Sequence, residues 1–110
     1  MKIIDFGFST YISGKDGKGI LHSELGTQSS MAPEIYKHKY RGEQTDVFAL
    51  GVILFMIYSG RAPFVNSKED EKYYSKIHHK EKYHLFWMAH ENDVSQPKVY
   101  FSDNFKKLFI

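Results

Sequence analysis

The longest apolar stretch of the chain lies near its centre, over residues 47–58, and its flanks predict a helix with defined ends. Thr45 is a suitable N-cap, Asp46 places a carboxylate near the positive end of the helix dipole, and Gly60 with Pro63 behind it stops the helix. Because the stretch is apolar on every face, we expect a helix that is buried on all sides. It is shorter than the roughly 20 residues that span a bilayer, so a membrane helix is not expected.

Weaker patterns precede this helix. Lys2–Phe6 predicts a short strand that ends at Gly7, and residues 13–19 form a polar, glycine-rich stretch that we expect to be a mobile loop. Ala32–Tyr36 predicts a first helical turn, where Pro33 is tolerated because the amide that it lacks would have no partner at a helix N-terminus.

Three further segments follow the central helix. A helix is expected from Ser67, with Asp70 as its capping-box-like partner. Residues 82–90 are rich in aromatic side chains, which we expect to pack against a neighbouring surface rather than to stack on bases. A last helix is expected near Ser102, and the chain ends inside it, so we expect a truncated C-terminal element.

Composition narrows the class of protein. The 110 residues suffice for at most one ordinary domain, and 15 basic against 13 acidic residues give a net charge of only +2. Bulk charge therefore supports neither a nucleic-acid partner nor a membrane partner. The chain has no cysteine, which excludes disulfides and thiolate sites, and Asp5 interrupts any secretory signal, so we expect a cytoplasmic location.

Two local patterns could indicate other sites. Residues 14–19 superficially suggest a phosphate-binding or calcium-binding loop, but the Gly-Lys-Ser/Thr of the first and the carboxylates of the second are missing. The six histidines do not show a zinc-binding spacing, since no pair four residues apart comes with an evident third ligand. We expect no metal site from either pattern.

Several short motifs occur in order along the expected elements: Asp5-Phe6-Gly7, Gly26-Thr27, Ala32-Pro33-Glu34, Asp46 with Gly51-Val52, and Gly60-Arg61-Ala62-Pro63-Phe64. One such tripeptide occurs by chance, but this series, each member in its expected structural context, resembles a eukaryotic-type protein serine/threonine kinase. The resemblance is strong over residues 1–64 and looser beyond. It implies a partial kinase domain, with the activation segment at 1–34 and the helical part of the C-terminal lobe at 35–110.

The implied fold is protein kinase-like and of the α+β class, as a C-terminal lobe fragment that is predominantly α-helical with one short N-terminal strand. By this resemblance Asp5 is a catalytic residue that holds Mg²⁺ and, through it, ATP, because a hard cation between phosphates prefers carboxylate oxygen. Gly7 lets the backbone turn sharply, and Phe6 packs in the hydrophobic spine that joins the lobes. The alternative for Asp5 is an ordinary aspartate at the end of a strand.

The resemblance also assigns roles within the activation segment. Ser23, three residues before Gly26, is the candidate phosphosite, although an exposed loop serine is an equal alternative. A phosphate there would order the loop by pairing with an arginine, but the family's usual arginine belongs to a His-Arg-Asp loop that this sequence lacks. Thr27 supports the catalytic aspartate and favours serine/threonine over tyrosine substrates. Ser30 replaces the tyrosine of many relatives.

The remaining motif residues are expected to be structural. Ala32, Pro33 and Gly51 belong to motifs that shape the lobe, Asp46 hydrogen-bonds the catalytic-loop backbone, and Glu34 pairs with an arginine late in the lobe. The sequence has only two arginines, Arg41 and Arg61, so Glu34 has no matching partner within the chain.

The implied reaction is transfer of the ATP γ-phosphoryl group to a serine or threonine hydroxyl of a protein substrate. The glycine-rich loop, the strand lysine, its helix glutamate, the catalytic aspartate and the second metal ligand are expected upstream of residue 1. A kinase N-terminal lobe is therefore a possible missing partner, and we expect negligible activity from the 110 residues alone. The alternative is a non-catalytic interaction module or a pseudokinase remnant.

Overall fold

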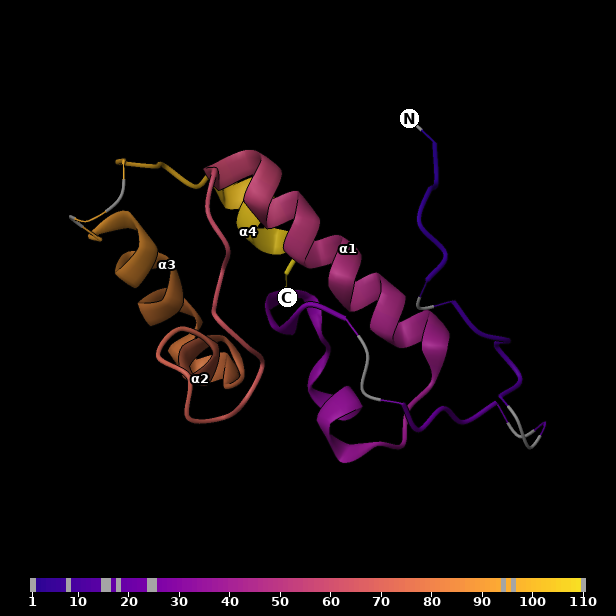
Figure 1. The fold of residues 1–110 in the computed structure, drawn as a ribbon. Coiled ribbons are helices and arrows are strands. Elements are labelled where there is room, and N and C mark those ends of the chain that lie inside the picture. Colours follow the sequence, from indigo (N-terminus) through magenta and orange to yellow (C-terminus); the bar gives the residue numbers. More distant parts are fainter. Residues whose placement is uncertain are drawn as a thin grey trace.

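The computed structural model describes residues 2–7, 9–14, 17, 19–23, 26–93, 95 and 97–109. Over these residues the fold is predominantly helical, as predicted, and Figure 1 shows α1 as its longest element. The elements in chain order are η1 (Gln28–Ser30), η2 (Pro33–Lys37), α1 (Gly42–Ser59), α2 (Tyr74–Ile77), η3 (Lys80–Lys82), α3 (Tyr83–Glu91) and α4 (Asp103–Lys107). No helix in the described part of the chain is long and apolar enough to cross a membrane.

The short strand expected at Lys2–Phe6 is not formed. These residues have no regular secondary structure, and Figure 1 shows them as an extended trace that stands away from the helices. A strand needs a neighbour to bind its backbone N–H and C=O groups, and no described segment lies beside them. Within the described ranges, β pairing is limited to one antiparallel bridge, between Leu21 and Tyr40.

The central helix was predicted more accurately at its end than at its start. Gly60 adopts the left-handed conformation, with φ of 75°, and its N–H donates to Met56 O at 2.8 Å, so the predicted stop is confirmed. The helix begins at Gly42, three residues before the expected cap at Thr45. The Thr45 hydroxyl donates to Gly42 O at 2.8 Å and accepts no first-turn amide, so Thr45 lies within the helix and does not cap it.

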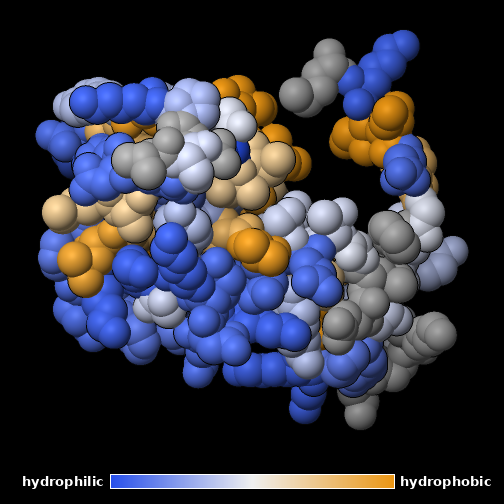
Figure 2. Space-filling model, turned by 60° about the vertical axis from the view of Figure 1, so that its left-hand side comes forward, coloured by the Kyte–Doolittle hydropathy of each residue, from blue (hydrophilic) through white to orange (hydrophobic). Residues whose placement is uncertain are grey.

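The prediction that the central helix is buried on all sides is wrong. Val52 and Phe55 are buried, whereas Ile57 on the other face is 73% exposed. The elements that pack closely on α1 lie on one side of it, so its other apolar side chains face outward. Hydrophobic residues accordingly reach the surface in Figure 2. The exposed large apolar residues of α1 are Val47, Leu50, Ile53, Leu54, Met56, Ile57 and Tyr58.

Phe55 is the centre of the core. Its side chain is 1% exposed, and its ring centroid lies 5.8 Å from Phe86, 6.0 Å from Trp87 and 5.4 Å from Phe101. Aromatic rings at these separations add attraction beyond the burial of their area. The predicted packing of the aromatic segment 82–90 is thus confirmed, because it forms α3 and packs directly on α1.

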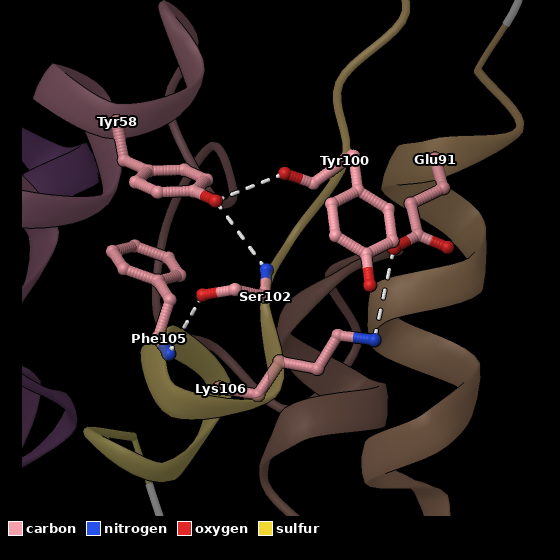
Figure 3. Close-up of polar contacts among 6 residues, drawn as sticks. All are labelled: Tyr58, Glu91, Tyr100, Ser102, Phe105 and Lys106. Atoms are coloured by element: carbon pink, nitrogen blue, oxygen red, sulfur yellow. Dashed lines mark hydrogen bonds and ion pairs between the residues drawn. The ribbon is translucent and has the colours of Figure 1, made fainter.

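The last helix starts where the sequence predicts. The Ser102 hydroxyl caps α4 by accepting from the Phe105 N–H at 3.2 Å. The Tyr58 hydroxyl of α1 donates to Tyr100 O at 3.0 Å and accepts from the Ser102 N–H at 3.3 Å (Figure 3). The Tyr58 and Phe105 rings stack with centroids 3.9 Å apart, so α4 is joined to the C-terminal end of α1.

The helix expected from Ser67 is shorter than predicted. Residues 67–73 form bends and turns, and α2 contains only Tyr74–Ile77. The Glu71 carboxylate accepts from the Tyr73 N–H at 3.0 Å and from the Tyr74 N–H at 2.7 Å, so Glu71 takes the capping role assigned to Ser67. Ser67 is used elsewhere, because its buried hydroxyl donates to Met31 O at 2.6 Å.

A buried hydrogen-bond network joins the end of α3 to the loop after α1. The guanidinium of Arg61 donates to His90 O at 2.9 Å and, through Nη2, to Pro97 O. His90 Nε2 lies 2.8 Å from Pro63 O, and since a carbonyl only accepts, Nε2 carries the proton. The His90 ring is buried against Phe55 and Tyr73. This burial lowers the pKa of His90 below its usual 6.5.

Replacing Phe55 by alanine is expected to cost about 3–5 kcal/mol of the free energy of unfolding, because the cavity would lie at the centre of the aromatic core. Ile57→Ala on the exposed face of the same helix is the matched control and is expected to stay within about 0.5 kcal/mol. Urea unfolding followed by Trp87 fluorescence measures both. Equal effects of the two substitutions would contradict the one-sided core.

The free energy of unfolding is expected to fall as the pH drops below 6.5, because unfolded His90 then binds a proton that the buried ring resists. Above pH 6.5, His90 contributes its full share to the free energy of unfolding. Unfolding curves between pH 8 and about pH 5 measure the slope. His90→Gln keeps an amide donor for Pro63 O and is expected to remove the part of the slope that comes from His90. His84→Gln at an exposed position is expected to leave that part of the slope unchanged. An unchanged slope in His90→Gln would disprove the assignment.

Candidate functional site

An open hollow of about 920 Å³ lies between the activation-segment residues and the N-terminal half of α1. It brings together three residues that the sequence singled out, Ser23, Thr27 and Asp46. Asp5, Phe6 and Gly7 do not line it. The hollow is lined by polar groups from both sides, among them Ser9, Thr10, Ser23, Thr27, Ser30, Tyr40, Thr45 and Asp46.

Asp5 has an unusual backbone conformation for a non-glycine residue. Its φ is 63°, in the left-handed region, which a short polar side chain tolerates better than a bulky one. Its Oδ1 accepts from the Gly7 N–H at 3.3 Å. The expected turn at Gly7 is present, but Asp5 rather than Gly7 takes the positive φ.

The exposed carboxylate of Asp5 fits the role of one magnesium ligand. Mg²⁺ is usually held by one or two carboxylates together with substrate phosphates and water, so a single accessible carboxylate is compatible with the ion. Over the described ranges, no group of three or more His, Asp or Glu side chains is placed to hold a metal. Asp5 would therefore share the ion with ligands from outside the described residues.

Phe6 does not pack as expected. Its side chain is 67% exposed, whereas the sequence predicted burial in an apolar spine. Residues 2–7 lie along the outside of the molecule, where no described element covers the ring (Figure 1). An aromatic ring can be buried only where other apolar groups surround it, and here they are missing.

Thr27 is exposed at the entrance to η1. Its backbone is extended, with φ of −79° and ψ of 130°, and its carbonyl accepts from the Ser30 N–H at 3.0 Å. The side chain does not cap η1. Among the described residues, no group binds the Thr27 hydroxyl, which therefore remains available toward the hollow.

The Ala32-Pro33-Glu34 motif starts the predicted helical turn, which is η2. Ala32 is fully buried and packs with Met31 and Ile35 in a second small core. Glu34 is half-buried and makes no ion pair with a described residue. Burial, and then the charge of Glu34, raise the pKa of the Tyr74 phenol, so Glu34 lies in the neighbourhood of α2.

Asp46 and Gly51 lie along α1. Asp46 is exposed and borders the hollow, in the second turn of the helix rather than at the expected N-terminus. Gly51 is half-buried, and a Cβ atom there would lie 3.8 Å from the Phe109 ring. This separation is an ordinary van der Waals contact, so the packing would also accommodate an alanine at this position.

Ser23 is exposed and is held by a contact that sequence reasoning missed. The Tyr40 hydroxyl donates to Ser23 O, and burial raises the pKa of that phenol. Leu21 and Tyr40 exchange both backbone hydrogen bonds, at 2.6 and 2.9 Å. No local sequence signal pairs these residues, because they lie far apart along the chain.

The glycine-rich loop is only partly described. Lys15, Asp16 and Lys18 lie outside the described residues, so its expected mobility is not tested. Gly14, Gly17 and Gly19 have φ values of 74°, 73° and 74°, a region that favours glycine.

Comparisons with known proteins agree with the motif series. The family model for the protein kinase domain matches residues 1–110. The chain belongs to the protein kinase family. CBL-interacting protein kinase 20 of Oryza sativa subsp. japonica is 42% identical over 74 residues, which are 66% of this chain and 16% of that protein. CBL-interacting serine/threonine-protein kinase 10 of Arabidopsis thaliana is 38% identical over 74 residues, 66% of this chain and 15% of that protein.

A third kinase relative, CBL-interacting protein kinase 15 of Oryza sativa subsp. japonica, is 39% identical over 82 residues, 74% of this chain and 19% of that protein. The predicted resemblance to serine/threonine kinases is confirmed by these relatives. The kinase chain spans less than a fifth of the length of each. No solved structure matches it significantly.

Ser67→Ala is expected to loosen the segment that leads into the Ala32-Pro33-Glu34 motif, because the substitution leaves the buried Met31 carbonyl without its donor. The local opening free energy should fall by about 1–3 kcal/mol. Hydrogen exchange at the Ser30 and Ile35 amides measures it. Ser75→Ala, which removes a hydroxyl bonded to its own turn at 3.1 Å, is the control. Equal exchange in both variants would contradict a tether at Ser67.

Proposed function

We propose that this kinase chain supplies the activation segment and central helix of a serine/threonine kinase, whose reaction transfers the ATP γ-phosphoryl group to a hydroxyl of a protein substrate. The observation that carries the proposal is the hollow between the activation segment and α1, since it gathers Thr27 and Asp46 on facing walls. Both are motif residues that kinases use around the catalytic loop.

Asp5 would hold Mg²⁺ in this reaction, and the ion would supply positive charge that offsets the developing charge on the phosphates. The exposed carboxylate and its fixed backbone support this role. The other residues that phosphoryl transfer needs, including a His-Arg-Asp loop, are absent from the 110 residues. The purified chain is therefore expected to show negligible magnesium-dependent ATP turnover.

Thr27 would orient the catalytic aspartate of the reacting kinase from the hollow. A hydroxyl in that place donates or accepts one hydrogen bond, and its loss should cost about tenfold in rate. Protein serine and threonine residues would be the acceptors, with the residues around Thr27 facing the substrate.

A graft tests these roles. The 74 residues of this chain that align with the rice CBL-interacting protein kinase 20 would replace the matching segment of that protein, which keeps the rest of its own chain. The graft is expected to phosphorylate a serine/threonine protein substrate. Asp5→Asn should abolish turnover, Thr27→Val should lower kcat about tenfold, and Thr27→Ser should restore it.

The control for the graft is thermal unfolding, which shows whether each variant folds. A folded graft with no turnover, or one in which Asp5→Asn is as active as the unmodified graft, would refute the proposed role. A loss of activity with Thr27→Ser equal to that with Thr27→Val would remove the hydroxyl from the mechanism.

A non-catalytic interaction module is the second candidate, and the exposed apolar face of α1 favours it. Contiguous exposed apolar surface of this kind marks places that other polypeptide covers. A sharp thermal transition and monomeric elution of the isolated chain would support this module, because they would show that the chain is stable without the rest of a kinase. Aggregation would instead support a kinase segment that needs its covering elements.

A further inference from the structure

A second hollow, of about 460 Å³, shares one residue with the hollow described above. Thr27 borders both of them. The other walls of the second hollow come from the loop after α1, through Ala62 and Val65, and from the end of α3, where Asp93 lies. A substrate whose acceptor hydroxyl lies beside Thr27 would therefore reach the second hollow with one of its neighbouring side chains.

The wall that the loop after α1 forms is apolar. Phe64 is buried, whereas Ala62 is exposed and Val65 is 68% exposed. An aliphatic chain that lies on this wall would remove apolar area from water on both sides of the contact. Lysine and arginine bury their aliphatic stems in this way and keep their charged ends in a polar place.

The polar end of the second hollow is the carboxylate of Asp93. Its Oδ1 accepts from the Ser95 hydroxyl at 2.5 Å and from the Ser95 N–H at 3.0 Å, and its Oδ2 accepts from the Tyr73 hydroxyl at 2.9 Å. A carboxylate has about four acceptor sites, so one remains on Oδ2. The hydrogen bonds from Ser95 and Tyr73 lower the pKa of Asp93 to about 2, so the group is charged at neutral pH.

The position of this carboxylate is fixed by the hydrogen-bond network around Arg61 and His90. The Tyr73 ring stacks on the buried His90 ring with centroids 4.2 Å apart. The Asp93 N–H donates to His90 O at 3.4 Å, and the same carbonyl accepts from Arg61. A charge that is already held in place loses little conformational freedom when it binds a partner.

Two cations lie near Asp93, but neither is paired with it. The Arg61 guanidinium is buried and donates to His90 O and Pro97 O. Lys72 Nζ lies over the Tyr73 ring, 5.1 Å from its centroid. Asp93 forms no ion pair with these or with other residues that the structure describes. Its carboxylate therefore keeps the capacity to bind a further cation.

We propose that Asp93 is a specificity-determining residue that selects a basic side chain, lysine or arginine, in the protein substrate. This inference rests on the proposed kinase function, in which the residues around Thr27 face the substrate. The stem of the basic side chain lies along Ala62 and Val65, and its cation donates to Asp93 Oδ2. No motif singled out Asp93, because it follows α3 and lies far along the chain from Thr27.

A graft that carries the whole chain tests this role. Since the family model matches residues 1–110, these would replace the matching part of the kinase domain of the rice CBL-interacting protein kinase 20. The substrate peptides share one acceptor serine and carry arginine, leucine or glutamate at each other position in turn. At one position the ratio of kcat/KM for arginine to that for leucine is expected to fall about threefold to tenfold in Asp93→Asn, the effect of losing one charge-assisted contact at a partly exposed site.

Three further variants separate a specific contact from a structural effect. Asp93→Lys should shift the preference at that position toward glutamate. Lys72→Gln, which removes a competing cation, should raise the ratio of arginine to leucine. Asp70→Asn, the same change at an exposed position outside the second hollow, is the matched control and should leave the ratio intact. A variant that only destabilises the fold lowers both values of kcat/KM and leaves their ratio unchanged.

An active graft whose ratio is the same with Asp93 and with asparagine at every position would overturn the inference and leave the proposed function standing. A folded graft without turnover would refute the proposed function, and NMR of the 110-residue chain then decides the role of Asp93. The Asp93 carboxyl ¹³C signal should shift more with N-acetyl-arginine methylamide than with N-acetyl-leucine methylamide. Equal shifts with the two compounds would overturn the inference.

Discussion

The burial of Phe55 is the constraint on which the rest of the structure depends. α3 packs on its ring through Phe86 and Trp87, the segment after α3 through Phe101, and α4 through Phe105. Removing these rings from water favours folding, and their mutual contacts add to this effect. Because these rings approach α1 from one side, the apolar side chains on its other side stay exposed.

The candidate site is attached to this core only indirectly. The N-terminal half of α1 forms one wall of the hollow, and the activation segment forms the other. That second wall is held by the small apolar core of Met31, Ala32 and Ile35, against which Phe48 of α1 packs. The Leu21–Tyr40 bridge and the Ser67 hydroxyl on Met31 O add polar contacts. Residues 20–23 lie outside this small apolar core and are positioned mainly by hydrogen bonds, so they can be displaced at a modest free-energy cost.

The hydrogen-bond network around Arg61 and His90 shows how a buried cation is accommodated with no carboxylate partner among the described residues. Arg61 donates to two backbone carbonyls, and His90 donates to a third. Hydrogen bonds to a charged group offset the cost of moving it out of water, and the flanking rings exclude competing solvent. The loop that follows α1 is thereby fixed to α3, which keeps the aromatic core closed.

The sequence alone determined the family, the order of its motifs and the features that depend on adjacent residues. Gly60 ends α1 and Ser102 caps α4, because each acts within one turn of its own position. Thr27 was singled out by motif for a catalytic supporting role and Asp46 for a structural one, although no sequence pattern shows that they share one hollow.

Tertiary structure decided whatever depends on residues far apart in the chain. The exposure of Phe6, the one-sided burial of α1 and the pairing of Ser23 with Tyr40 all follow from which elements lie beside them. Ser67 binds Met31 O in place of capping a helix for the same reason. Local preferences differ by about 1 kcal/mol, so a buried long-range contact of similar or larger free energy overrides them.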